Sequence, residues 1–204
     1  MRTTAQILAI AALALNVGVR AEDPPRGEQL MFIQPEGWEV VYEEREDNLS
    51  TTEYVPPEQT EGLWHEMLTV QIMLEERDAN PDLMLTRAVD YLSRRCESFD
   101  ALPIQLAGVG KYPTLAVMTL CGLDTSSRLG EVSLLRAIAG EENFYLLQKA
   151  WRVAPFDVRQ ESPVDLESRK FWLGYLAYMR VCNPAKEDCL HLGTAENVAP
   201  AGSQ

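Results

Sequence analysis

Residues 131–153 read EVSLLRAIAGEENFYLLQKAWRV, and this stretch decides the predicted fold. Two largely apolar runs, 131–139 and 143–153, are separated by the short sequence Gly140-Glu141-Glu142. Strand-forming runs on either side of a short loop that contains glycine predict a β-hairpin. Because the two strands of a hairpin run in opposite directions, this stretch predicts an antiparallel sheet.

Other parts of the chain supply further strands for this sheet. Residues 64–75 alternate between a fully apolar face and a mixed face that begins with Met67 and Thr69. Residues 115–121 are apolar throughout, which is typical of a central strand covered on both faces. The predicted strands outside the hairpin are residues 30–34, 38–42, 51–55, 64–75, 103–109 and 115–121.

A first helix is predicted to begin at Asn80-Pro81. Asn80 suits the N-cap, and Pro81 suits the first helical position, where its missing N–H leaves no hydrogen bond unmade. The spacing of three and four places Cys96 on the core-facing side of this helix. The apolar residues that define the side are Leu85, Val89, Leu92 and Cys96.

A second helix is predicted after residue 162. Ser162 and Asp165 resemble a capping box, with Pro163 at the first helical position. The end of the helix, residues 171–179, is apolar nearly all round, which predicts heavy burial. Strands in hairpins combined with two separate helices predict the α+β class, an antiparallel sheet with helices packed on it.

The first 21 residues have the pattern of a secretory signal peptide. A basic residue, Arg2, precedes the apolar run 7–15, and small residues follow at Val19 and Ala21. We expect cleavage after Ala21; the alternative is an anchor that is never removed. The expected organisation is a signal peptide at 1–21, a flexible lead-in at 22–29, a single domain at 30–192 and a disordered tail at 193–204. The expected location is periplasmic or secreted.

The chain is strongly acidic. Its formal charge is −13, and removal of Arg2 and Arg20 with the signal peptide makes it −15. Such a charge repels phosphate backbones and anionic lipid, so we expect neither nucleic-acid binding nor electrostatic docking on a membrane surface. No segment after the signal peptide is long and apolar enough to cross a membrane, so we expect no membrane insertion after cleavage. Acidic clusters at 43–47 and 75–78 are read as solvated strand ends, and a calcium site is the alternative, although the EF-hand spacing is missing.

Four cysteines predict two disulfides in an oxidising compartment, with three pairings possible. We favour Cys182 with Cys189, because Asn183-Pro184 predicts a turn between them, and this leaves Cys96 with Cys121. Redox chemistry is one alternative. Zinc bound by Cys182, Cys189 and His191 with one more ligand is another, but oxidised thiols cannot act as thiolate ligands.

Several segments resemble domains with the PsbP-like fold, and also an uncharacterised family of exported proteobacterial proteins. The resemblance implies an α/β/α sandwich and a periplasmic address. It implies no catalytic residues, and the broader fold mostly hosts accessory and assembly proteins. The segments that carry it are residues 32–38, with Pro35-x-Gly37-Trp38, then 53–56, 64–71, 131–152 and 181–182, followed by a second cysteine.

No catalytic or cofactor motif stands out, and no cofactor is predicted. His65 is the one histidine placed to act as a base, but no G-x-S-x-G sequence surrounds Ser50, Ser126 or Ser127. Neither G-x-x-x-x-G-K-[ST] nor G-x-G-x-x-G occurs, and Gly108 to Lys111 is read as a turn. A hydrolase that uses His65 with a carboxylate such as Glu66 is therefore an alternative rather than the leading hypothesis.

Aromatic residues give the candidate binding surface. Trp64 follows a proline-rich loop and is expected to be an exposed anchor, with Tyr54 second and His65 beside it. The leading hypothesis is an exported, non-enzymatic binding or accessory protein with an unidentified protein partner. The alternatives are the hydrolase based on His65 and a thiol-redox protein.

Overall fold

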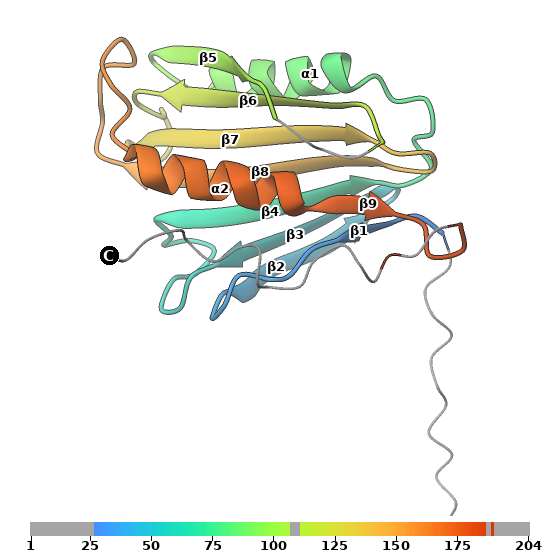
Figure 1. Ribbon diagram of the computed structural model, residues 1–204. Coiled ribbons are helices and arrows are strands. Elements are labelled where there is room, and N and C mark those ends of the chain that lie inside the picture. The colour runs from blue at the N-terminus through green and yellow to red at the C-terminus, as the bar shows by residue number, and fades with distance from the viewer. Residues whose placement is uncertain (1–26, 107–110, 187–188, 190–204) are drawn as a thin grey trace, which may run out of the picture.

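The computed structural model describes residues 27–106, 111–186 and 189. The signal peptide predicted at 1–21, the end of the strand predicted at 103–109, and the tail predicted at 193–204 lie outside them. Figure 1 shows the elements in this part of the chain. Their bounds are β1 (Gln29–Met31), β2 (Glu39–Glu46), β3 (Leu49–Val55), β4 (Glu66–Met73), α1 (Pro81–Ser93), β5 (Phe99–Ile104), β6 (Thr114–Cys121), β7 (Gly130–Ala139), β8 (Phe144–Val153), α2 (Leu166–Tyr178) and β9 (Arg180–Cys182).

Seven strands form one antiparallel sheet in the order β2-β3-β4-β8-β7-β6-β5, and β1 pairs with β9 separately. The predicted hairpin is confirmed: β7 and β8 pair from Gly130 opposite Val153 to Ala139 opposite Phe144. The Gly140 amide closes the turn by donating to the Asn143 carbonyl at 2.9 Å.

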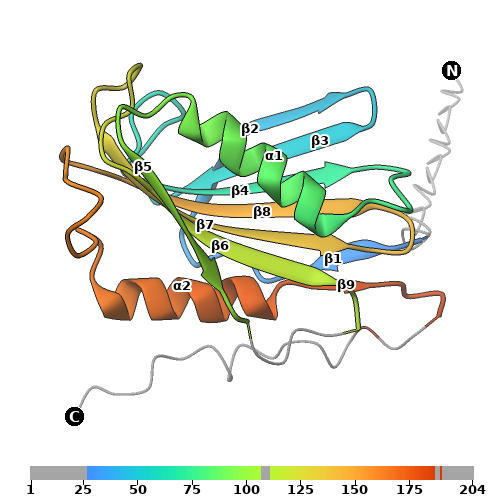
Figure 2. The ribbon, with the colours of Figure 1, turned by 90° about the horizontal axis from the view of Figure 1, so that it is seen from above.

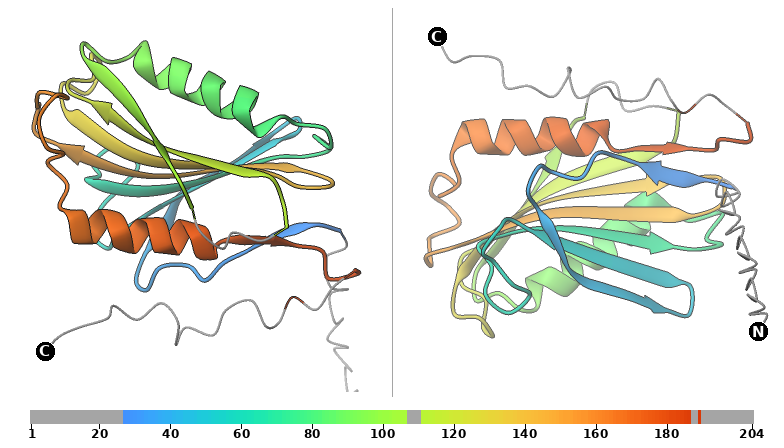
Figure 3. Two further views of the ribbon diagram at one scale, coloured as in Figure 1. Left: turned by 45° about the horizontal axis from the view of Figure 1, so that its top comes forward. Right: turned by 90° about the horizontal axis from the view of Figure 1, so that it is seen from below.

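The two helices lie on opposite faces of the sheet (Figure 3, left). On one face α1 packs against β5, β6 and β7, and on the other face α2 packs over β7. The α+β class with helices packed on an antiparallel sheet is therefore confirmed. Since α1 covers only the β5–β7 side, β2 and β3 lie uncovered beside it (Figure 2).

The middle strand of the sheet is β8, with β4 and β7 on either side, and not β6. The prediction of a central 115–121 strand is wrong, because only the edge strand β5 separates β6 from the side of the sheet. Leu115 is 40% exposed. An apolar run reports what covers a strand locally: Val117 packs in the cluster under α1, and Leu120 packs in the cluster on the α2 face. It does not report the position of the strand in the sheet.

Helix α1 begins as predicted and ends before Cys96. The Asn80 side chain accepts hydrogen bonds from the Asp82 and Leu83 amides, and Pro81 is the first residue. The helix ends at Ser93, so Cys96 is not on its core-facing side; it forms an isolated β-bridge with Asp124 instead. The apolar spacing continues one turn past the true end of the helix, because spacing alone does not show where the backbone stops making helical hydrogen bonds and begins to pair with another segment.

Helix α2 begins three residues later than the capping-box pattern predicts. Its N-cap is Asp165, whose carboxylate accepts from the Ser168 amide at 2.8 Å. Trp172 and its neighbours on one side are buried, but Leu166 and Phe171 are exposed, so the predicted burial all round is wrong. The helix rests on the sheet along one side, and nothing among the described residues covers the other.

Two buried charges fix parts of the chain that are far apart in sequence. Arg136 of β7 donates to the carbonyls of Leu176 and Met179, at the negative end of the α2 dipole. Glu28 accepts hydrogen bonds from the Glu141 and Asn143 amides in the β7–β8 turn. Glu28 is therefore part of the fold, and the prediction of a flexible lead-in does not hold for its last residues.

Both favoured disulfides are present. Cys96 bonds Cys121 with 25 residues of sequence separation, and Cys182 bonds Cys189 with a separation of 7. The turn that Asn183-Pro184 predicts brings the second pair together, and the Asn183 carboxamide accepts from the Ala185 amide within it.

Candidate binding groove

A groove of about 580 Å³ runs between α1 and the uncovered part of the sheet, and we call it the α1 groove. Its floor comes from β4, β8 and β7, one wall comes from α1, and the other comes from β3 and the loop before β4. The lining residues are Glu53, Glu61, Trp64, Met67, Thr69, Gln71, Met73, Met84, Arg87, Ala88, Tyr91, Leu92, Arg95, Glu131, Leu135, Leu146, Gln148, Ala150 and Arg152.

The floor mixes flexible apolar and polar side chains. Alternate residues of a strand share a face, so Met67, Thr69 and Met73 of β4 point into the groove together. In the neighbouring β8, Gln148 lies opposite Thr69. Such a floor differs from the opposite face of β4, where Leu68 and its neighbours pack in the core.

The α1 wall presents one side of the helix. Met84, Ala88 and Tyr91 follow the spacing i, i+4, i+7 and therefore lie along one stripe. Tyr91 is 64% exposed. Nη1 of Arg87 lies 4.0 Å from Sδ of Met84, and a thioether sulfur is a weak hydrogen-bond acceptor. The wall thus combines an apolar stripe with an exposed positive charge.

One end of the groove is polar and partly buried. The guanidinium carbon of Arg152 lies 3.7 Å from the centre of the Trp64 ring, a cation–π contact. Within the ranges that the structure describes, its Nε has no hydrogen-bond partner. Burial, helped by the charge of Glu61, raises the pKa of Glu53. Burial also raises the pKa of Glu131, against the hydrogen bond from Ser133.

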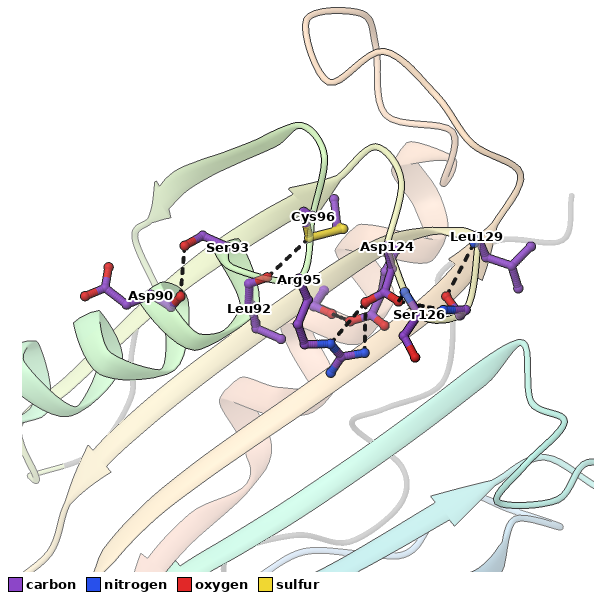
Figure 4. Close-up of a disulfide and its surroundings, with 12 residues drawn as sticks. Asp90, Leu92, Ser93, Arg95, Cys96, Asp124, Ser126 and Leu129 are labelled. Carbon is purple, nitrogen blue, oxygen red and sulfur yellow. Dashed lines mark hydrogen bonds and ion pairs between the residues drawn. A yellow bond between two sulfur atoms is a disulfide. The ribbon is translucent and has the colours of Figure 1, made fainter.

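The α1 wall is fastened at its C-terminal end to the β6–β7 loop (Figure 4). The Cys96–Cys121 disulfide joins this end to the last residue of β6. Within the loop, the Asp124 carboxylate accepts from Arg95 at 2.9 and 3.1 Å and from the Ser127 amide at 2.8 Å, and the Thr125 amide donates to the Arg95 carbonyl at 2.8 Å. Burial alone would raise the pKa of Asp124, but the Ser127 hydrogen bond and the charge of Arg95 hold it below its ordinary value.

The opposite face of the sheet holds a buried lysine. Lys149 is fully buried, and its Nζ lies 4.3 Å from the Trp151 ring centre, 4.7 Å from that of Trp172 and 5.2 Å from that of Trp38. Nζ donates to Glu66 at 2.9 Å and to the Ala150 carbonyl at 3.0 Å. Its hydrogen bonds are thus satisfied inside the core.

The predicted binding residues do not form one surface. Trp64 lines the end of the groove, but it is only 8% exposed, so it is not an exposed anchor; Arg152 covers its ring. Tyr54 points to the other face, where it packs against Phe32 with ring centres 6.0 Å apart. The alternation of a strand separates Tyr54 from the groove, since its neighbour Glu53 is the residue that lines it.

The residues for the alternative chemistries are also dispersed. His65 is exposed, and among the described residues no hydrogen bond joins its imidazole to Ser50, Ser126 or Ser127. Both disulfides are formed, and each includes a buried cysteine, Cys121 in one and Cys182 in the other. The described ranges contain no cluster of three metal-ligating side chains, and His191 lies outside them.

Sequence reasoning missed the residues that build the groove. Arg87, Tyr91 and Arg152 carried no motif, because each lies on a different element and only packing brings them together. One signal was available: the mixed face of β4, with Thr69 and Gln71 among methionines, indicates a strand that lacks a helix over that face. The apolar opposite face indicates one that is covered.

The architecture defines a class of α+β protein, an antiparallel sheet between two helices with half of one face open. No family model matches the chain. No curated protein matches it. Among solved structures, a mutant of the protein Mog1 is similar, with 13% identity over 74% of this chain and 90% of that chain and a TM-score of 0.46. That degree of likeness carries no argument about function.

Proposed function

We propose that this is an exported binding or accessory protein that holds a partner in the α1 groove. The observation that carries the proposal is the half-covered sheet face: α1 packs over β5–β7, and a groove of about 580 Å³ with a mixed lining lies beside it. This volume is in the range of ligand sites, and the lining has the usual mixture of apolar area and a few charged groups.

The composition of the groove supports a binding function rather than a sheet face that is merely left without a covering helix. Three methionines, Met67, Met73 and Met84, belong to the apolar part, and their unbranched side chains adapt to the shape of a partner. Arg152 is held over Trp64 at the polar end with an Nε that has no partner among the described residues.

The export part of the proposal rests on the signal-peptide pattern of residues 1–21 and on the two disulfides, which persist in oxidising compartments. No helix in residues 27–106 and 111–186 is long and apolar enough to cross a lipid bilayer.

The test blocks the groove from within. Thr69 lies half-buried in the centre of the floor, and Thr69→Trp places an indole there on a residue type that strands tolerate well. Thr86→Trp is the matched control, because Thr86 is exposed on α1 and does not line the groove. Tagged versions are used to capture partners from a cell-envelope extract of the source organism, and mass spectrometry quantifies them.

We expect at least one protein to be retained by the wild type and by Thr86→Trp and lost with Thr69→Trp, while circular dichroism shows both variants folded. Equal retention by all three proteins would show that the groove is not the binding site.

A further inference from the structure

We infer that the α1 groove receives an amphipathic helix of a partner protein, with acidic residues on the flank that faces α1 and basic residues on the flank that faces β3. The inference rests on the proposed function and specifies its partner. Its support comes from the dimensions of the open sheet, the free side of α1, the pairing of the floor strands and the distribution of charge.

The open part of the sheet has room for one helix. From β8 to β2 there are three strand spacings, about 14 Å. A helix with its side chains is about 10–12 Å wide. The eight residues of β4 extend for about 26 Å. This is the length of about 17 helical residues. A helix of four to five turns would therefore lie beside α1 and complete the layer on this face.

The side of α1 that faces the groove is prepared for such a neighbour. Leu85 is buried against the sheet, Met84 and Ala88 are half-buried at the edge of the same cluster, and Tyr91 beside them is exposed to the groove. Small Ala88 between two larger residues gives a ridge-and-groove surface of the kind that packs against another helix. A partner helix would thus contact both the floor and this side of α1.

An extended peptide fits this floor less well than a helix does. Strand β4 is already paired with β3 on one side and with β8 on the other, so its backbone groups are occupied. An extended segment in the groove would find no backbone partners there. A helix satisfies its backbone hydrogen bonds internally and needs only side-chain contacts.

The two walls carry opposite charges. The α1 wall contributes Arg87 and Arg95. The opposite wall contributes Glu53 and Glu61, and the charge of Arg152, which lies over Trp64, partly offsets that of Glu53. Arg95 is neutralised by Asp124, which leaves Arg87 as the exposed positive group on its side. Complementary charges determine which partner binds and in which orientation, so a helix with one acidic and one basic flank suits this groove.

The probes are three synthetic peptides of about 17 residues with an identical leucine and alanine face. One has an acidic and a basic flank, one has two acidic flanks and one has two basic flanks. Each carries a fluorophore, and fluorescence anisotropy measures Kd for the full chain after signal removal at physiological salt. We expect the peptide with unlike flanks to bind about tenfold more tightly than either of the others, which corresponds to 1.4 kcal/mol.

Charge reversal on α1 tests the orientation. Arg87→Glu makes both walls acidic, so we expect the preference to move to the peptide with two basic flanks. Arg94→Glu is the control: it makes the same change in net charge on the last turn of α1, and Arg94 does not line the groove. This control should keep the ranking of the wild type.

Thr69→Trp should abolish binding of all three peptides. The inference is overturned if the peptide with unlike flanks binds no better than the others, or if Arg87→Glu and Arg94→Glu give the same ranking. If the peptides fail but an extract partner still depends on Thr69, the groove is a binding site for something other than this helix. If that dependence is missing as well, the proposed function fails with it.

Discussion

At the scale of single residues, Lys149 shows how the fold accommodates a charge in its core. Burial lowers its pKa to about 8, and the nearby Glu66 only partly opposes this. The unfolded chain holds the same proton up to the ordinary value of 10.5. Between these values the unfolded state binds more protons than the folded state, so stability rises with pH across this window and stays at its lower value below it.

Replacement of this lysine by methionine should remove that pH dependence. Between pH 7.5 and pH 10 the wild type should gain about 2 kcal/mol in free energy of unfolding relative to Lys149→Met. The thioether fits among the three tryptophans, so the variant should fold. Urea unfolding at both pH values measures the difference. Parallel behaviour of the two proteins would show that Lys149 does not titrate differently in the folded state.

Asp124 also has a lowered pKa, but the fold favours the charged form of Asp124, whereas it disfavours the charged form of Lys149. Because its pKa is held below the ordinary 3.8, its contribution is complete above that value and is lost as the pH falls through the folded pKa. Asp124→Asn keeps the shape but loses the charge that faces Arg95, and it should lower stability at pH 7 by about 1–3 kcal/mol. Thermal unfolding at pH 7 and at pH 2.5 should show that the difference in stability between the wild type and Asp124→Asn is smaller in acid. Asp78→Asn, at an exposed acid, should show no gap at either pH.

Residue types predicted local structure well and exposure badly. Asn80 was identified as an N-cap because the capping bond lies within three residues of it. The exposure of Trp64 was wrong because its cover, Arg152, comes from a strand much later in the chain. A sequence pattern contains the first kind of information and lacks the second.

At the scale of elements, the Cys96–Cys121 disulfide holds α1 in position as a wall of the groove. In the chain-entropy model, its separation of 25 residues corresponds to about 3.5 kcal/mol, and the separation of 7 in Cys182–Cys189 to about 2.5 kcal/mol. The two disulfides thus contribute similar free energies of stabilisation, but they join different parts of the chain.

Removal of the two disulfides should therefore give different local effects. With Cys96→Ser and Cys121→Ser, the last turn of α1 should lose protection in amide hydrogen exchange and the groove peptides should bind more weakly. With Cys182→Ser and Cys189→Ser, α1 should keep its protection. Equal loss in both double variants would show that the first bond stabilises the fold only globally.

The kinds of element were also predictable where the pattern was local. The β7–β8 hairpin, the two helices and the Cys182–Cys189 pair followed from short segments, and the Cys96–Cys121 pair followed because those two cysteines were left. The order of strands did not: β8 lies beside both β7 and β4, and the second pairing joins segments that are far apart in sequence. The groove depends on that pairing, so it could not be predicted.

At the scale of the whole molecule, helices and apolar clusters cover the middle strands of the sheet more completely than its β2–β3 edge. The β7–β8 pair has apolar clusters on both sides, whereas β2 and β3 extend beyond α1 (Figure 2). Strands with less apolar packing are expected to open at a lower free energy than the strands in the middle of the same sheet.

Native-state hydrogen exchange should reveal this difference. We expect the amides of β7 and β8 to exchange only through global unfolding, and those of β2 and β3 to exchange through smaller openings with lower free energy. Saturation with the peptide that has unlike flanks should slow exchange in β3 and β4 more than in β5. Uniform exchange across the sheet would contradict the proposed weakness of this edge.

The fastening of α1 has a consequence for where the protein can act. While the thiols of Cys96 and Cys121 are reduced, only non-covalent contacts join the end of α1 to the loop after β6, among them the Arg95–Asp124 ion pair and the hydrogen bond from the Thr125 amide to the Arg95 carbonyl. The end of the α1 wall would then be held less firmly than in the oxidised protein. On the proposed export, formation of this disulfide after the chain leaves the reducing compartment would fix the wall, so the groove would reach its final rigidity only there.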